Sequence, residues 1–414
     1  MNDTSCLLGR ESSHGSLFPF LTVPVTTQFA LLLFAGSVIR VYATSHPLRF
    51  VGFVGNHNAS EIIPRQGPVV DRDYIETVAK AHELGGFDAV LQAFHSDAPD
   101  SLQVSQHITG VTDRLGVLIA HRPGFQAPTI LARQFATLDQ LSRGRVAINV
   151  ITGAERSELA RDGNSVEDKD DRYARTSEFL DIVRAEWTSE TPFDYEGKYY
   201  RVEQAFSQVK PYNASGIPVW IAGASQAAID VAGRHADTFA LWGETHEQVR
   251  ELLGRVRAAV AKAGRPQPAF SLSLRPILAD TEEAAWAKAD AIHEKAKALL
   301  DKTGFRRGEL PNNEGARRLI AIADAAADKG HRHDKRLWTA IAGLTGAKGN
   351  STSLVGTPDQ VADALLDYYD LGITTFLIRG FDPLPDAISY GRELLPRVRR
   401  LVAERRPAQA VAAE

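Results

Sequence analysis

Eight short apolar runs, rich in β-branched residues, recur between helical stretches along most of the 414-residue chain. The helical stretches carry apolar residues at a spacing near ~3.6, whereas the short runs are bounded by turn-forming residues. Such alternation is typical of βα units that build a parallel sheet. The runs occupy residues 50–54, 87–92, 115–120, 146–151, 218–222, 237–241, 270–274 and 375–378. Eight strands, each followed by a helix, predict an α/β fold closed as a (β/α)8 TIM barrel rather than an open sheet.

The main helices are expected at residues 74–84, 128–141, 171–185, 226–235, 247–263 and 359–371. Two connections are too long for simple loops: residues 152–217, after strand four, and residues 282–356, after strand seven. Insertions at these places would lie over the carboxyl-terminal mouth of a barrel, where active sites form. The second insertion includes a segment rich in Gly, Lys and Ser at residues 343–353, and it is interpreted as a mobile lid.

The two ends of the chain differ from the barrel segment in composition. Residues 1–45 are expected to be a disordered N-terminal extension, residues 46–404 a single barrel domain, and residues 405–414 a flexible tail. The apolar stretch at residues 29–39 is too short to span a bilayer. A signal peptide ending near Ala43 is the alternative, but the basic start that it needs is reduced to Arg10. We therefore expect a cytoplasmic protein.

Composition excludes several classes of function. The 47 Lys and Arg residues nearly balance the 51 Asp and Glu residues, and no long basic run occurs. We therefore expect a small-molecule partner, with no nucleic acid and no membrane surface bound. The single cysteine, Cys6, lies in the N-terminal extension, which excludes disulfides, cysteine-bound zinc and thiol catalysis. The pair His331 and His333 has no carboxylate framework around it, so no metal site is expected.

Polar side chains follow all eight predicted strands, which is where the active-site residues of barrels lie. Any one of them alone fits a structural role, but their joint placement predicts a site at the mouth. The set consists of Asn56, His57, His95, His121, Arg122, Asn149, Thr152, Ser225, Trp242, Glu244, Arg275 and Arg379.

Gly223, Ala224 and Ser225 stand at the end of strand five, directly before a helix. Backbone N–H groups and the helix dipole there would form an anion site that suits a phosphate. A tight turn in which Ser225 caps the helix fits the spacing equally well. Lys169 and Tyr173 favour the phosphate, because residues four apart share a face if this part of the insertion is helical. No dinucleotide-binding, P-loop or nucleophile-elbow motif occurs, so the barrel itself would bind a phosphorylated cofactor.

The run PTILARQFATLDQLSRGRVAINVITG, at residues 128–153, resembles the signature of the bacterial-luciferase-like, flavin-dependent monooxygenases. In that signature a helix ending in D-x-[LI]-S-x-G-R leads into a strand ending in N-[IVL]-[VI]-[TS]-G. Further similar segments are RYARTSEF (172–179), YEGKYY (195–200), PVWIAGAS (218–225), ALWGE (240–244), LVGTPDQVAD (354–363) and GRELLPRVR (391–399). The resemblance covers about residues 48–400 and is closest to the alkanesulfonate monooxygenase branch.

This resemblance implies a two-component enzyme that uses FMN. A separate NAD(P)H-dependent flavin reductase would supply reduced FMN (FMNH2), and reaction with O2 would cleave the C–S bond of a small anionic organosulfonate, giving sulfite and an aldehyde. By matching motif, Asn149 and Thr152 would contact the flavin, and Lys169, Tyr173, Gly223, Ala224 and Ser225 would hold its phosphate. The resemblance also implies a homo-oligomer, either a dimer or a tetramer.

Departures from the family pattern affect the substrate more than the cofactor. His57 and Trp242 match residues of the alkanesulfonate site and, with Arg275, are the predicted catalytic residues. The family's strand-seven Arg and His correspond to Ser273 and Arg275, its strand-eight Tyr and His to Phe381 and Pro383, and its strand-two Cys to Ala98. The roles of those family residues therefore do not transfer directly.

Arginine is suited to a sulfonate, so we expect Arg275 and Arg379 to bind the anionic head, with Arg122 third. Lys348 of the lid would close over the substrate. A structural alternative is that Arg275 is salt-bridged away from the pocket. His57 is expected to handle protons, because imidazole titrates near neutrality.

Trp242 and Phe381 are expected to shield the flavin from water. The alternatives to desulfonation are a luciferase-like monooxygenase acting on a sulfone or another small substrate, a deazaflavin-dependent oxidoreductase, and a flavin-binding or structural barrel without catalysis. A metal-dependent barrel hydrolase is disfavoured, because no ligand set is visible in the sequence.

Overall fold

The computed structural model describes residues 46–152, 156–163, 168–304, 313–347, 349 and 351–411. It also describes two short strands, β1 (Leu33–Phe34) and β2 (Ser37–Val38), which pair with each other in antiparallel fashion. The rest of the expected N-terminal extension and the predicted substrate residue Lys348 lie outside the described residues. The proposed division into extension, barrel and tail therefore stays a prediction, although helix α13 (Leu395–Val411) continues into the expected tail.

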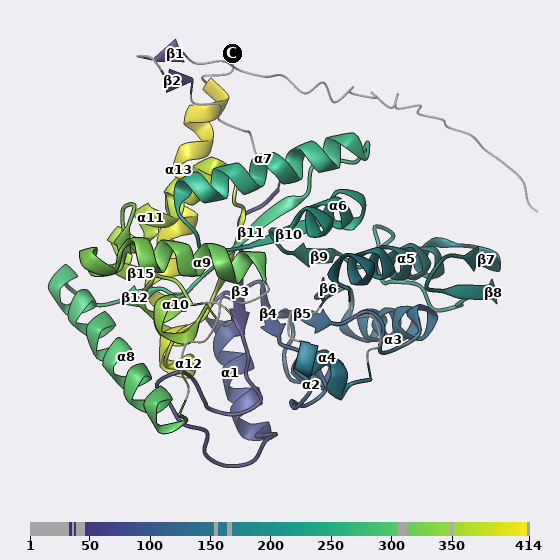
Figure 1. Ribbon diagram of the computed structural model, residues 1–414, viewed down its shortest axis with the longest axis horizontal. Helices are drawn as coiled ribbons and strands as arrows, with labels where there is room; N and C mark the ends of the chain where they lie inside the picture. The colour runs from purple at the N-terminus through teal and green to yellow at the C-terminus, as the bar shows by residue number, and fades with distance from the viewer. Residues whose placement is uncertain are drawn as a thin grey trace, which may run out of the picture. The chain divides into compact units, whose positions relative to one another are not determined.

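Eight parallel strands close a barrel in chain order, which confirms the predicted fold (Figure 1). The ring closes where the last strand pairs with the first, with Phe376 opposite Phe50. The strands are β3 (Arg49–Phe53), β4 (Ala89–Gln92), β5 (Gly116–His121), β6 (Val146–Val150), β9 (Val219–Ala222), β10 (Thr238–Trp242), β11 (Ala269–Leu274) and β16 (Thr375–Ile378).

A layer of apolar side chains fills the barrel interior. The buried members are Val51, Leu118, Trp220 and Leu377, with small residues such as Ala147 and Ala240 packed among them. Because strand side chains alternate between the two faces, the residue two positions further along each strand also points inward. Phe53, Asn149, Trp242 and Arg379 stand in these positions, at the carboxyl ends of the strands that form the mouth. The apolar layer therefore makes the floor on which a site at the mouth rests.

Helices cover the outside of the barrel, and the six predicted ones begin and end at or near the expected residues. Several begin with a side-chain cap, such as Asp71, Ser225 and Thr357, which accepts a hydrogen bond from a free N–H group of the first turn. The helices are α1 (Arg72–Leu84), α2 (Ser101–Val111), α3 (Pro128–Ser142), α5 (Lys169–Thr188), α6 (Gln226–His235), α7 (His246–Lys262), α11 (Pro358–Leu371), α12 (Pro383–Ser389) and α13, with the π-helical segment η2 (Tyr390–Leu394) between the last two.

The insertion after β6 adds the short helix α4 (Arg156–Arg161) and, beyond α5, a hairpin of β7 (Phe193–Glu196) and β8 (Arg201–Ala205). The hairpin corresponds to the turn-rich stretch seen in the sequence. In Figure 1 it lies at the outer end of α5, away from the barrel strands.

The insertion after β11 is a packed unit, where the sequence predicted a mobile lid. Its four-stranded sheet has the order β12-β15-β14-β13, and a second apolar core centred on Trp338, Ile341 and Phe381 holds it together. Its elements are β12 (Ile277–Leu278), α8 (Glu282–Lys302), α9 (Glu314–Ala325), η1 (Ala327–Lys329), β13 (Arg332–His333), β14 (Leu337–Trp338), α10 (Ala340–Thr345) and β15 (Ser353–Gly356). We call this set the strand-seven insertion. The expected mobility of this insertion stays a prediction.

Within the described part of the chain, every helix is too short or too polar to cross a lipid bilayer.

Candidate active site at the mouth of the barrel

Three of the predicted cofactor residues come together beside β6 and β9. Tyr173, in the first turns of α5, forms hydrogen bonds with Ser225 and with Thr152. Burial raises the pKa of the Tyr173 hydroxyl, and these two hydrogen bonds oppose the rise. The phenol is therefore neutral at neutral pH and keeps its proton as a donor. These three hydroxyl groups, which the sequence separates widely, form one polar cluster.

Gly223 closes this cluster on the side of the backbone. Its φ of +134° is unfavourable for residues with a side chain, and an added Cβ would lie 2.7 Å from Cβ of Ala228 and 3.0 Å from the Tyr173 hydroxyl oxygen. Ser225 is the N-cap of α6, as the alternative interpretation had it, and its Oγ accepts a hydrogen bond from the Ala228 N–H at 3.4 Å. The first turn of a helix carries further N–H groups without partners in the helix, so capping does not exclude an anion here.

Asn149 and Lys169 flank the same region. Asn149 points into the mouth from β6, and its Oδ1 is buried with no hydrogen-bond partner among the residues that the structure describes. Lys169 is the first residue of α5. This lysine lies near the start of α9. Its charge helps to lower the pKa of Glu314 there, although the main cause of that lowering is a hydrogen bond from Arg317. The structure thus brings the predicted cofactor residues to one side of the mouth.

The second group at the mouth is a cluster of Glu61, Arg275 and Arg379. Oε1 of Glu61 lies 2.8 Å from Nη1 of Arg275 and 2.9 Å from Nη2 of Arg379. The two arginines follow the adjacent strands β11 and β16, whereas Glu61 lies in the loop after β3. Sequence reasoning missed Glu61, and its only signal was a position in the loop after the first strand.

The Arg275 side chain is fully buried, at 0% exposed. Its guanidinium carbon stands 3.5 Å from the centre of the Phe381 ring, and its Nη2 donates to the Gly380 carbonyl at 2.9 Å. Burial and the charge of Arg379 lower the pKa of Arg275 to about 10, while Glu61 opposes them, so the group stays charged at neutral pH. Arg275 is thus salt-bridged, but to a carboxylate at the mouth rather than away from the pocket, and its role toward the substrate stays a prediction.

Glu61 is held as a carboxylate. Burial alone would raise its pKa, but the positive charges of Arg275 and Arg379 outweigh that effect and bring it down to about 2. Arg379 differs from Arg275 in being 26% exposed, and it lies over the Phe53 ring with 4.9 Å between guanidinium carbon and ring centre. Arg379 is therefore open to an incoming solute, whereas Arg275 is not.

Phe381 does not face the open mouth. It is 1% exposed and belongs to the core of the strand-seven insertion, where its ring forms the support on which Arg275 stacks. Its expected contact with the flavin stays a prediction.

Trp242, at the end of β10, is positioned by the strand-seven insertion. An added Cβ on Gly315, the second residue of α9, would lie 3.5 Å from ring atom Cε3 of Trp242, which is van der Waals contact. Glu244, two residues after Trp242, is 3% exposed. It accepts hydrogen bonds from Nε and Nη2 of Arg318 on α9, at 2.7 to 3.0 Å. We call the Arg318 and Glu244 pair the latch.

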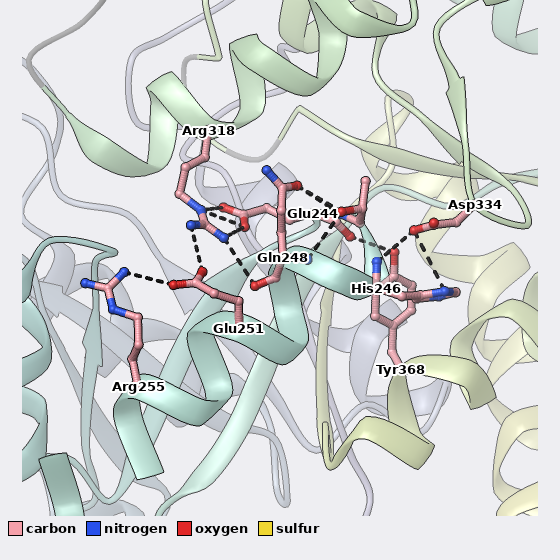
Figure 2. A network of polar contacts seen from close by, with 9 residues as sticks. Glu244, His246, Gln248, Glu251, Arg255, Arg318, Asp334 and Tyr368 are labelled. Carbon is pink, nitrogen blue, oxygen red and sulfur yellow. Dashed lines mark hydrogen bonds and ion pairs between the residues drawn. The ribbon is translucent and has the colours of Figure 1, made fainter. Parts of the chain in front are cut away.

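Figure 2 shows how the latch joins a wider network. Arg318 also donates to Glu251 at 2.9 Å, and the Glu244 backbone oxygen accepts from the Tyr368 hydroxyl at 2.8 Å. Burial raises the pKa of Glu244, and the hydrogen bonds and charge of Arg318 oppose that rise. Glu244 was predicted as one of the polar residues of the site, but the structure uses it to attach α9 to the barrel.

His57 lies in the loop after β3, half-exposed. Its Nδ1 is 3.1 Å from the Val69 carbonyl oxygen of the same loop. This contact orients the ring. The role of His57 in proton handling stays a prediction.

His121, the last residue of β5, and Arg122, which follows it, belong to neither polar cluster at the mouth. His121 stacks on Phe179 of α5 at 5.7 Å between ring centres, and burial lowers its pKa to about 3, so it is a neutral residue of the layer between strands and helices. Its expected place in the polar set at the mouth was wrong. Arg122 is bound to Glu158 at 2.6 Å and lies over Phe94, so it has a carboxylate partner already, and its substrate role stays a prediction.

His331 and His333 of the strand-seven insertion make structural contacts. Nδ1 of His331 and Nε2 of His333 bond to the carbonyl oxygens of Ala323 and Ile322, in the last turn of α9. Among the residues that the structure describes, no group of three His, Cys, Asp or Glu side chains could hold a metal ion.

A groove of about 750 Å³ lies outside the barrel, between α2 and α3. Gln103 and Gln106 line it on one side and Ile130 and Leu141 on the other. None of the polar clusters at the mouth opens into it, so we do not assign it to the chemistry.

Comparison with known proteins decides the family. The model of a family described as luciferase-like monooxygenase matches residues 48–375, which is most of the chain. The chain belongs to the luciferase-like monooxygenase family. The sequence resemblance is confirmed at this level, and the barrel is the fold expected of such an enzyme.

Solved structures support the same fold. A riboflavin lyase with modified FMN and riboflavin is 21% identical, with a TM-score of 0.70 over 86% of this chain and 92% of that one. The EDTA monooxygenase of Chelativorans sp. BNC1 is 24% identical, with a TM-score of 0.69 over 86% and 94%. DmoA from Hyphomicrobium sulfonivorans is 21% identical, with a TM-score of 0.67 over 85% and 87%. At these identities the likeness establishes the fold of this luciferase-like monooxygenase and leaves its substrate open.

Proposed function

We propose that this luciferase-like monooxygenase takes FMNH2 from a separate NAD(P)H-dependent reductase and cleaves the C–S bond of a small organosulfonate. The observation that carries the proposal is the pairing of two sites at one mouth: a hydroxyl and glycine cluster suited to a phosphate, and two arginines suited to a sulfonate.

The residues beside β6 and β9 fit an FMN group. The crowded Gly223 leaves backbone N–H groups accessible where a side chain would block them. Tyr173 and Ser225 add hydroxyl donors, and Lys169 adds a positive charge for the phosphate. The buried Oδ1 of Asn149, which has no partner, gives the ring of a flavin a polar contact inside the mouth. When bound, reduced flavin supplies two electrons and activates O2.

The overall reaction balances with these partners alone. One oxygen atom of O2 enters the aldehyde and the other leaves as water, with two electrons and two protons from FMNH2. The C–S bond breaks, and sulfite leaves with its electron pair while the carbon loses one proton. The protein's part is to hold the sulfonate at Arg379 and Arg275, to orient the reacting carbon and to exclude water with Trp242. His57, which sits on the β3 loop, is the proposed acceptor of the carbon-bound proton.

A panel assay tests the proposal. The full chain is incubated with FMN, NADPH, a generic flavin reductase and either linear sulfonates, sugar sulfonates or neutral sulfones of matched length, and sulfite is measured against a reductase-only control. We expect sulfite from sulfonates. Turnover of sulfones alone, or activity only with a reduced deazaflavin, would replace this proposal with the corresponding alternative.

A further inference from the structure

Glu61 occupies the position that the proposed function gives to the substrate. A single carboxylate oxygen stands between two guanidinium groups, 2.8 Å from Arg275 and 2.9 Å from Arg379. These arginines follow neighbouring strands and face one site. A side chain of the protein therefore already fills the space where two arginines would receive an oxyanion.

The cluster has more donors than acceptors. Nε and Nη1 of Arg275 are buried without a well-oriented hydrogen bond, although Nη1 is within ion-pair distance of Glu61. Oε2 of Glu61 is also buried, with no hydrogen-bond partner in the described part of the chain. Within the cluster itself, two positive charges face one negative charge. Buried polar atoms are nearly always paired, so this arrangement favours a ligand whose two or three oxygens satisfy the remaining donors.

We infer that Glu61 is a built-in competitor for the anionic head of the substrate, which must displace the Glu61 carboxylate to bridge Arg275 and Arg379. The inference rests on the proposed function and deepens it, because it makes Glu61 a specificity-determining residue. A sulfonate or a similar small oxyanion can replace a carboxylate between two guanidinium groups. A neutral sulfone cannot, since it brings no charge to compensate the arginines.

The position of Glu61 in the fold allows such an exchange. It belongs to the stretch between β3 and α1, which contains no helix or strand, and its side chain is 24% exposed. Arg275, by contrast, is fixed by the Phe381 ring and by the Gly380 carbonyl. The carboxylate can therefore turn toward solvent while the arginine that it leaves stays in place.

Binding of methanesulfonate to the purified full chain, measured by calorimetry, tests the inference. Glu61→Gln keeps the shape of the side chain but removes the competing charge, so we expect the dissociation constant to fall at least tenfold, an order-of-magnitude expectation for one unit charge at close range. Glu282→Gln is the matched control. Glu282, like Glu61, is paired with arginine, through one oxygen to each of Nη1 and Nη2 of Arg336 at 3.1 Å, but this arginine follows neither β11 nor β16. That variant is expected to bind methanesulfonate like the wild type.

A double variant locates the effect. Glu61→Gln combined with Arg379→Ala should lose the gain, and dimethyl sulfone, the neutral probe, should show none in any variant. Unchanged or weaker binding by Glu61→Gln would overturn the inference, because Glu61 would then be a fixed counter-ion that orders the arginines. A gain that persists in the double variant would also overturn it, because the anion would be bound elsewhere.

The binding assay needs no flavin, oxygen or sulfite, so it separates this inference from the proposed function. Tighter methanesulfonate binding without sulfite release would preserve the inference and refute desulfonation. Sulfite release by an enzyme whose Glu61→Gln variant shows no tighter binding would do the reverse.

Discussion

Removing Arg318 is expected to destabilise the fold by breaking the buried ion pair between α9 and the barrel. In the latch, Glu244 is 3% exposed and Arg318 15% exposed, and the guanidinium donates to both carboxylate oxygens (Figure 2). Arg318→Met keeps most of the apolar stem but leaves the Glu244 carboxylate buried without its cation. Breaking a buried ion pair from one side costs about 3–5 kcal/mol. At ~2.1 cal/mol/K of unfolding entropy per residue over a barrel of this size, the loss corresponds to a fall in Tm of roughly 4–7 °C.

The assay is equilibrium urea unfolding followed by circular dichroism, with two further variants. Arg255→Met is the control, because Arg255 makes only long contacts, 3.3 Å to Glu251 and 3.4 Å to Gln226, at the half-exposed edge of the same network, and its loss should cost below about 1 kcal/mol. Glu244→Met with Arg318→Met replaces the whole pair by apolar groups and should recover most of the lost stability. The reasoning is refuted if Arg318→Met is no worse than Arg255→Met, or if the double variant is as unstable as the single one.

Further predictions concern the cofactor cluster and pH. Gly223→Ala should lower the free energy of unfolding by about 1–3 kcal/mol and weaken FMN binding, because its φ is +134° and an added Cβ would meet Ala228. Gly254→Ala in α7 should be stabilising, because an added Cβ there meets nothing within 4 Å. Urea unfolding and flavin titration check both variants. Tyr173→Phe removes the hydroxyl that bonds to Ser225 and Thr152 and should weaken FMN binding by roughly five- to twentyfold in the same titration, while Tyr212→Phe, half-exposed on the outside, should leave it unchanged; equal affinities would remove Tyr173 from the cofactor site. The pKa of Glu61 is depressed to about 2, so its ion pairs stabilise the fold fully above its ordinary pKa of 4.5 and lose that contribution as pH falls toward 2. The difference in unfolding free energy between wild type and Glu61→Gln should therefore shrink by up to about 3 kcal/mol between pH 5 and pH 2. A difference that stays constant over this range would contradict the assignment.

The fold could be predicted because each barrel strand is buried on both faces. Such strands read as continuous apolar runs, and the helices between them carry a clear period, so strand order and count followed from local sequence. The cofactor cluster could also be predicted, because Gly223 and Ser225 are close in sequence and Tyr173 lies on a predicted helix.

The polar clusters at the mouth depend on contacts that sequence spacing does not encode. Glu61 and Arg379 are 318 residues apart, and nothing in the loop around Glu61 marks it as the partner of an arginine. Glu244 carries the latch because α9 of a long insertion packs against it. The apolar spacing of α9 indicates which face of the helix is buried, but not which barrel residue lies opposite Arg318. His121 was misplaced because consecutive residues at a strand end point to opposite faces, and only one of His121 and its neighbour can face the mouth.

A single-turnover experiment without any reductase tests the central claim most directly. FMN reduced by light is bound anaerobically to the full chain with an organosulfonate, and one addition of O2 starts the reaction. The account predicts one sulfite and one aldehyde for each bound flavin that is oxidised. Flavin oxidation that yields no sulfite with any sulfonate of the panel would contradict it.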